Sequence, residues 1–161
     1  MAGNAPHFSV ENLNHAKVAI ISARWHEEIC SNLVSGSQRA LQSLGITQHE
    51  TFRVAGSFEL PFAAKIALDS GFDAAVVLGV VVRGETPHFD YVCQGVTNGV
   101  MKVQLEARKP IGFGVLTVDT VEQAIARSGI PGSKEDKGYD SAMAAIDLLR
   151  LQENFSNRIT R

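Results

Sequence analysis

The stretch Ala74-Ala-Val-Val-Leu-Gly-Val-Val-Val82 decides the fold class that this sequence predicts. It is a continuous apolar run, rich in valine, without the alternation of apolar and polar residues that marks a half-exposed strand. A strand of this kind is buried on both faces, which is typical of a parallel sheet with helices on both sides. The run is too short to cross a bilayer, and we expect no association with membranes.

Apolar and β-branched runs on either side of this stretch predict the other strands. These runs are residues 17–23, 51–54 and 111–116. Between the strands, apolar residues recur at helical spacing, and the helices are expected to end at Gly45, Gly71 and Pro110. Two more helices follow the last strand. This order predicts an α/β protein, namely a flavodoxin-like three-layer α/β/α sandwich with a four-stranded parallel sheet.

Polar residues that can cap helices precede three of the helical segments. Their side-chain oxygens can accept hydrogen bonds from the free N–H groups of a first helical turn. The predicted caps are Ser57, Thr86 and, for a short fourth helix, either Asp119 paired with Glu122 or Thr120 paired with Gln123. A polar loop over residues 131–138 is expected to precede the last helix.

Composition limits the class of protein. A chain of 161 residues predicts one domain, 1–161, whose first 16 residues form an N-terminal arm. Fifteen Lys and Arg against 17 Asp and Glu argue against nucleic-acid binding. Cys30 and Cys93 are each isolated in a helical pattern, so we expect buried free thiols and no metal site. The first residues lack an export signal, and a cytoplasmic location is expected.

Ligands of such sheets bind beyond the carboxyl ends of the strands, where this sequence places its unusual polar and aromatic residues. Glu85 and Thr86 lie at a predicted helix start, which favours an anion such as phosphate, although capping by Thr86 is an equally good explanation. His88 in the first turn suits proton transfer, whereas an ordinary surface histidine is the alternative. Trp25 suits stacking on a heteroaromatic ring or core packing. Glu59 suits hydroxyl binding or a favourable interaction with the helix dipole.

Several common catalytic motifs are missing from the sequence. It contains no G-x-G-x-x-G after a strand, no P-loop, no G-x-S-x-G elbow and no H-E-x-x-H. These absences argue against hydride, phosphoryl and metal chemistry.

The loops together resemble the 6,7-dimethyl-8-ribityllumazine synthase family. The similar blocks are Arg24-Trp25-His26, Gly56-Ser57-Phe58-Glu59-Leu60-Pro61, Leu78 to Tyr91 with its Arg83-Gly84-Glu85-Thr86-Pro87-His88-Phe89, and Glu122-Gln123-Ala124-x-Ala126-Arg127-x-Gly129. The likeness runs in order from Lys17 to Leu149. It implies the condensation of 5-amino-6-(D-ribitylamino)uracil with 3,4-dihydroxy-2-butanone 4-phosphate in riboflavin biosynthesis, without a metal ion or other cofactor.

The resemblance also implies roles for individual residues. Trp25 would stack on the pyrimidine, although the family usually has Phe there, and His88 would transfer protons. The other implied roles are ribityl binding by Ser57, Phe58 and Glu59, recognition of the uracil edge by Val80, Val81 and Val82, and phosphate binding by Glu85, Thr86 and Arg127. Phe113 would line the pocket, and Lys137 would lie near the substrates. Glu85 replaces a smaller residue, so its side chain is expected to face solvent.

The family likeness implies a homopentamer with active sites between subunits, to which Phe113, Arg127 and Lys137 would contribute from the neighbouring chain. Some relatives form 60-subunit shells. The loop 129–138 is slightly long and contains Pro131, which favours free pentamers here. Two alternatives remain open from the sequence: an archaeal-type riboflavin synthase, and a flavin-binding shell protein without activity.

Overall fold

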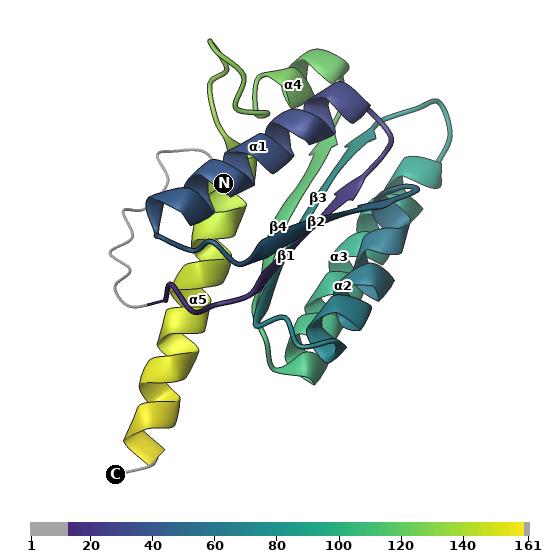
Figure 1. Ribbon diagram of the computed structural model, residues 1–161. Coiled ribbons are helices and arrows are strands. Elements are labelled where there is room, and N and C mark those ends of the chain that lie inside the picture. The colour runs from purple at the N-terminus through teal and green to yellow at the C-terminus, as the bar shows by residue number, and fades with distance from the viewer. Residues whose placement is uncertain (1–12, 160–161) are drawn as a thin grey trace.

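Four parallel strands form the central sheet, which confirms the predicted α/β fold class (Figure 1). The computed structural model describes residues 13–159, so most of the expected N-terminal arm lies outside the described residues. The strands are β1 (Val18–Ala23), β2 (His49–Val54), β3 (Ala74–Val82) and β4 (Ile111–Val118). Their order in the sheet is β2-β1-β3-β4, and every neighbouring pair is parallel.

Helices cover both faces of the sheet. They are α1 (Glu27–Ser43), α2 (Leu60–Asp69), α3 (His88–Ala107), α4 (Val121–Ile125) and α5 (Lys137–Ile159), with a 3-10 turn, η1 (Ser57–Glu59), before α2. Figure 1 shows α1 and α5 on one face and α2 and α3 on the other. The chain steps outward from β1 to β2 and then back across β1 to β3. Right-handed crossovers in opposite directions place α1 and α2 on opposite faces.

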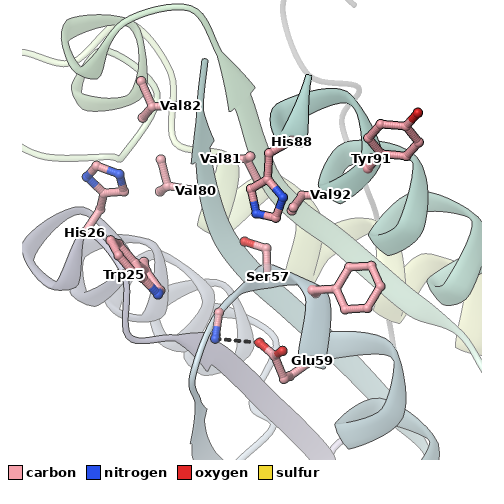
Figure 2. Close-up of a pocket in the computed structure, with 12 residues that line it drawn as sticks. Trp25, His26, Ser57, Glu59, Val80, Val81, Val82, His88, Tyr91 and Val92 are labelled. Carbon is pink, nitrogen blue, oxygen red and sulfur yellow. Dashed lines mark hydrogen bonds between the residues drawn. The ribbon is translucent and has the colours of Figure 1, made fainter. Parts of the chain in front are cut away.

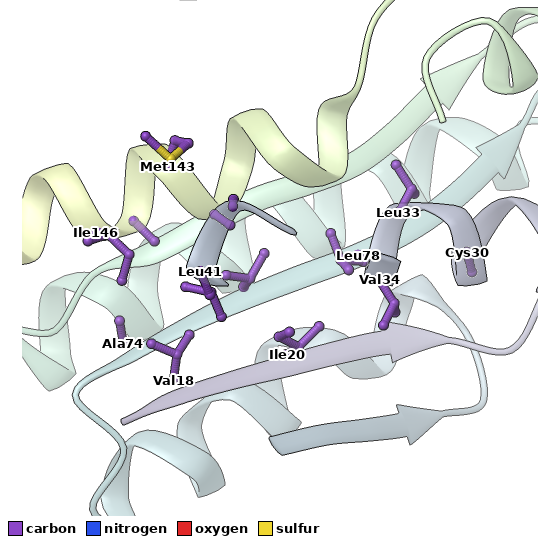
Figure 3. Packing of buried hydrophobic residues seen from close by; sticks show 14 of the residues in the cluster. Val18, Ile20, Cys30, Leu33, Val34, Leu41, Ala74, Leu78, Met143 and Ile146 are labelled. Carbon is purple, nitrogen blue, oxygen red and sulfur yellow. The ribbon is translucent and has the colours of Figure 1, made fainter. Parts of the chain in front are cut away.

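Alternate residues of β3 supply two separate hydrophobic layers. Val76 and Leu78 belong to the cluster beneath α1 and α5, whereas Ala75 and Val77 belong to the cluster beneath α2 and α3. Figure 3 shows the first cluster, in which side chains from both helices meet those of β1 and β3. Burial of both faces from Ala74 to Val80 confirms the interpretation of the apolar run.

Two of the predicted helix caps are wrong. Ser57 lies inside the 3-10 turn, and the carboxylate of Glu59 accepts the hydrogen bond from the Gly56 N–H instead, at 2.8 Å. Thr86 lies one residue too early, because α3 begins at His88 after Pro87, which already has a helical φ of −62°. The prediction for the short fourth helix is confirmed in its second form, since Thr120 Oγ1 accepts from the Gln123 N–H at 3.3 Å.

Two further sequence expectations need correction. The last helix begins at Lys137, inside the loop predicted over residues 131–138. Cys93 is only partly buried, whereas Cys30 is fully buried as expected, and both are free thiols. Burial raises the pKa of each thiol, so neither is poised as a thiolate. Within residues 13–159, no helix is both long and apolar enough to cross a membrane.

Gly138 allows a close approach between α1 and α5. The buried Ser37 hydroxyl of α1 donates a hydrogen bond to the Gly138 carbonyl at 2.9 Å. A Cβ added at Gly138 would overlap the Leu33 carbonyl oxygen, which belongs to the backbone and cannot move aside on its own. Glycine here lets two helix backbones touch.

Gly138→Ala should therefore destabilise the protein. Forcing apart two packed helices costs about 2 kcal/mol or more, which would appear as a lower midpoint of denaturant unfolding. Gly84→Ala is the matched control, because a Cβ at Gly84 would meet nothing within 4 Å. Its unfolding free energy should stay within about 0.5 kcal/mol of the parent protein. Equal stability of the two variants would contradict this account of the α1 and α5 contact.

Candidate active site

A cavity of about 680 Å³ opens at the carboxyl ends of β1 and β3 (Figure 2). Its walls are Trp25, His26, Gly56, Ser57, Phe58, Glu59, Val80, Val81, Val82, His88, Tyr91 and Val92. The helices after β1 and β3 leave toward opposite faces of the sheet, so a crevice forms between the two strand ends. Residues predicted from three separate loops and one strand end therefore meet in one place.

The end of β3 presents open backbone to this cavity. Strand β1 pairs with β3 only as far as Ser22 opposite Leu78, among the described residues. Strand β3 continues to Val82, with β4 as its partner on the other side. The N–H and C=O groups of residues 79–82 that point toward β1 are therefore free to bind a ligand. A flat ring with alternating donors and acceptors along its edge would satisfy them.

Ser57 carries a buried polar atom that the fold itself does not satisfy. The residue is 6% exposed, and its Oγ finds no hydrogen-bond partner within residues 13–159. A Cβ at Gly79 would collide with this oxygen, so glycine on β3 makes the room that the hydroxyl occupies. A buried hydroxyl without a partner is costly, and this oxygen is available for a hydrogen bond with a ligand in the cavity.

Glu59 and Trp25 flank the same turn. Glu59 Oε2 accepts the 2.8 Å hydrogen bond from the Gly56 N–H, which orients the carboxylate while leaving it capacity to accept from ligand hydroxyls. The Trp25 side chain is 71% exposed although it lines the cavity. A Cβ at Gly56 would lie 3.4 Å from Trp25 Cδ1, so the indole rests close to this glycine. An exposed indole at a cavity wall is a stacking surface.

His88 is the first residue of α3, and its exposed side chain projects into the cavity (Figure 2). The free N–H groups of a helix start carry partial positive charge. An imidazole in this position can exchange protons with a bound ligand.

A second cavity, of about 440 Å³, lies along β4 and does not include His88. Phe113, Arg127 and Lys137 line it together with Gln123 and Glu135. Strand β4 is at the edge of the sheet, and Phe113 on it is 41% exposed. Within one chain, the predicted site residues that line a cavity therefore fall into two separate groups.

Carboxylates hold the cations of the second cavity. Lys137 Nζ contacts Glu135 Oε2 at 2.5 Å and Asp140 Oδ2 at 3.1 Å. The hydrogen bond with Glu135 raises the pKa of Lys137, and the same bond lowers the pKa of Glu135. Arg127 donates to the Gln123 carbonyl at 2.9 Å and lies 3.8 Å from Glu135. Its guanidinium is partly exposed and can also bind an anion at the cavity.

Glu85 and Thr86 lie in the exposed loop between β3 and α3 and line neither of these two cavities. The exposure of Glu85 agrees with a side chain directed to solvent. The loop borders the first cavity, because Val82 before it and His88 after it both line that cavity.

Four residues of the first cavity are not among the predicted site residues. Tyr91 and Val92 follow His88 by three and four positions, so helical periodicity alone could have identified them. Gly56 was noted only as part of its loop. His26 has a left-handed φ of 55°, a backbone feature that a histidine in the sequence does not signal.

Comparison with known proteins agrees with the geometry. The sequence profile described as 6,7-dimethyl-8-ribityllumazine synthase matches residues 15–153. The chain is 54% identical over 142 residues to the protein of that name from Streptomyces coelicolor, covering 88% of each chain. It is 48% identical over 162 residues to the one from Pseudarthrobacter chlorophenolicus, covering 97% of this chain and all of the relative. A protein of the same name from Clavibacter michiganensis is 52% identical, with 81% of each chain covered.

The ion pair in the second cavity predicts a pH dependence of stability. Glu135 has a folded-state pKa below its ordinary value of 4.5, so its contribution is present above pH 4.5 and is lost as the pH falls through the lowered pKa. Lys137 has a pKa above its ordinary 10.5, so its contribution is lost only as the pH rises beyond that value. Lys137→Met should lower the unfolding free energy most between these limits, measured by urea unfolding across pH.

Lys134→Met is the control for this experiment. Lys134 is an exposed lysine of the loop that precedes α5, and its replacement should change stability little at any pH. A loss in Lys137→Met that did not vary with pH would show that packing of the aliphatic stem, rather than the ion pair, stabilises this wall.

Proposed function

Because the chain belongs to the 6,7-dimethyl-8-ribityllumazine synthase family, we propose that its two cavities are two halves of the active site of that enzyme. The chain is a transferase of riboflavin biosynthesis, which condenses 5-amino-6-(D-ribitylamino)uracil with 3,4-dihydroxy-2-butanone 4-phosphate. The observation that carries the assignment of the site is the first cavity, where an exposed indole, open strand backbone, an unsatisfied hydroxyl, a carboxylate and an imidazole converge.

The pyrimidine fits between Trp25 and the end of β3. The indole offers a flat face for stacking. The open N–H and C=O groups of residues 80–82 match the alternating donors and acceptors of a uracil edge. A ring held by its face and its edge has little rotational freedom, which places its 5-amino group for reaction.

The ribityl chain fits the turn before α2. Glu59 accepts hydrogen bonds from hydroxyl groups, and the Ser57 hydroxyl can either donate or accept. The hydrogen bond from the Gly56 N–H keeps the carboxylate facing the cavity before substrate arrives. Binding therefore requires little rearrangement of this turn.

His88 is suited to move the protons of the reaction. The 5-amino group attacks the ketone, water leaves to give an imine, phosphate is eliminated, and the ribityl-bearing nitrogen closes the second ring. Each step adds or removes a proton, and one imidazole can serve as base and acid in turn. Because His88 is the first residue of α3, it lies next to the loop with Glu85 and Thr86. We assign phosphate binding to this loop.

The second cavity supplies the remaining half from a neighbouring chain. Arg127 would bind the phosphate as a charge-assisted partner, with Lys137 beside it and Phe113 covering the substrates. Exposed aromatic and aliphatic side chains on α2 and α3, among them Phe62 and Tyr91, leave a surface for a second copy. We propose a homopentamer of single-domain chains in the cytoplasm, where the two free thiols stay reduced.

Ser57→Ala tests the role of the unsatisfied hydroxyl. Removing it takes away no hydrogen bond described in the unliganded protein, so the unfolding free energy should not fall. The KM for the ribitylaminouracil should rise about three- to tenfold, as for one neutral hydrogen bond, while the KM for the butanone phosphate stays the same. Loss of stability without a change in KM would assign Ser57 a structural role.

Complementation between two impaired variants, assayed at low butanone phosphate, tests whether the halves come from different chains. His88→Ala should lower kcat by about 100- to 10,000-fold, and Arg127→Ala should raise the KM for the butanone phosphate. If each site takes His88 from one chain and Arg127 from the next, mixed assemblies of the two variants regain intact sites. Co-expression in equal amounts should restore about a quarter of the parental activity.

Lumazine fluorescence measures product in each assembly, and the separately expressed variants serve as the baseline. Mixed assemblies no more active than that baseline would contradict the proposal. They would mean that His88 and Arg127 of different chains do not share an active site.

A further inference from the structure

Arg83 connects the end of β3, the first turn of α3 and the turn after β4. It is the first residue after β3, and its Nε donates to Asp119 Oδ1 at 2.8 Å in the turn after β4. Its NH1 lies 3.5 Å from Asp90 Oδ1 in the first turn of α3. Its guanidinium carbon lies 4.2 Å above the ring of Phe89 in the same turn.

The sheet itself brings Arg83 and Asp119 together. Val82 on β3 is paired with Val118 on β4, so the residues that follow them leave neighbouring strands at the same level. The Arg83 N–H also donates to the Val118 carbonyl at 2.9 Å, which continues the ladder by one bond. The Arg83–Asp119 pair thus forms at the ends of β3 and β4, where the chain continues to α3 and α4.

A short series of hydrogen bonds continues from Asp119 to the second cavity. The Asp119 N–H donates to Gln123 Oε1 at 2.8 Å, and Arg127 NH1 donates to the Gln123 carbonyl at 2.9 Å. Arg83 therefore lies between the helix that begins with His88 and the segment that carries Arg127. In Figure 1, α4 lies beside α1, whereas α3 lies on the opposite face of the sheet.

We propose that Arg83 is a positioning residue. Its contacts fix the position of the first turn of α3 relative to the turn between β4 and α4. This inference rests on the proposed function, in which His88 and Arg127 of one chain serve two neighbouring sites. Arg83 does not line either cavity and contacts no proposed substrate group. Its action is to orient the phosphate loop and Arg127 together.

The contacts suit arginine in particular. An exposed pair of one cation and one carboxylate contributes little by itself. Here one planar guanidinium contacts two carboxylates at different edges and an aromatic ring at its face, a combination that a lysine ammonium cannot reproduce. Replacement should therefore alter geometry more than global stability.

Kinetics of Arg83→Gln separate this role from a general structural one. The KM for the butanone phosphate should rise about tenfold, in the range for residues coupled to a site that they do not touch. The KM for the ribitylaminouracil should stay within twofold, since Trp25, Ser57 and Glu59 stand on other loops. For Arg83→Lys, the KM for the butanone phosphate should lie between those of the parent protein and Arg83→Gln. Asp119→Asn should give the same pattern, and the double variant should be no worse than the more impaired single variant.

Amide hydrogen exchange provides a readout that does not depend on activity. Arg83→Gln should speed exchange in two separate segments, residues 84–90 and 119–127, with unchanged rates in α2. Lys65→Gln is the control, because Lys65 pairs with Asp69 on the surface of α2 away from both segments. It should alter neither the kinetics nor exchange in those two segments.

Three results would overturn the proposal: an equal rise of both KM values, additive effects of Arg83→Gln and Asp119→Asn, or faster exchange in only one segment. Failure of the proposed function would be seen differently, as absence of lumazine product from the parental protein. The exchange experiment would still decide whether Arg83 holds the two segments together.

Discussion

The burial of β3 on both faces is the constraint on which the rest of the structure depends. A strand whose two faces are both apolar requires a layer of helices on each side, and α1 with α5 and α2 with α3 supply them. The same strand extends past the last residue that pairs with β1. Because β1 stops and β3 continues, the sheet leaves backbone groups open at the point where its helices diverge. The cavity follows from this difference in strand length.

The cavity contains polar groups that the fold positions but does not satisfy. Gly79 gives the Ser57 hydroxyl its space, and the Gly56 N–H orients the Glu59 carboxylate. Groups that are already oriented lose little entropy on binding, which favours affinity and reaction between two substrates held together. On the proposed function, the Ser57 hydroxyl, which lacks a partner among the described residues, is free to bind the substrate.

The cations around the site are held by carboxylates in different ways. Lys137 is close to two acidic groups, so its charge is largely compensated, whereas Arg127 has a more distant carboxylate and a partly exposed guanidinium. Arg83 contacts two carboxylates and an aromatic ring. On the proposed function, this distribution directs the phosphate toward Arg127 and leaves Arg83 to orient the segments around it.

The sequence by itself determined the parallel sheet, the helices between its strands and the loops at which a site would form. Apolar runs and helical periodicity involve residues that are close together in the chain, so they can be recognised without coordinates. Tertiary structure decided the details that depend on distant residues. Ser57 and Thr86 have side chains that can cap a helix. In the structure, however, Ser57 lies within the 3-10 turn before α2, and α3 begins only after Pro87. The separation of Arg127 from His88, the burial of the Ser57 hydroxyl beside Gly79 and the contacts of Arg83 arise only when β1, β3 and β4 lie side by side. Strand order and relative strand length bring together residues that are far apart in the chain.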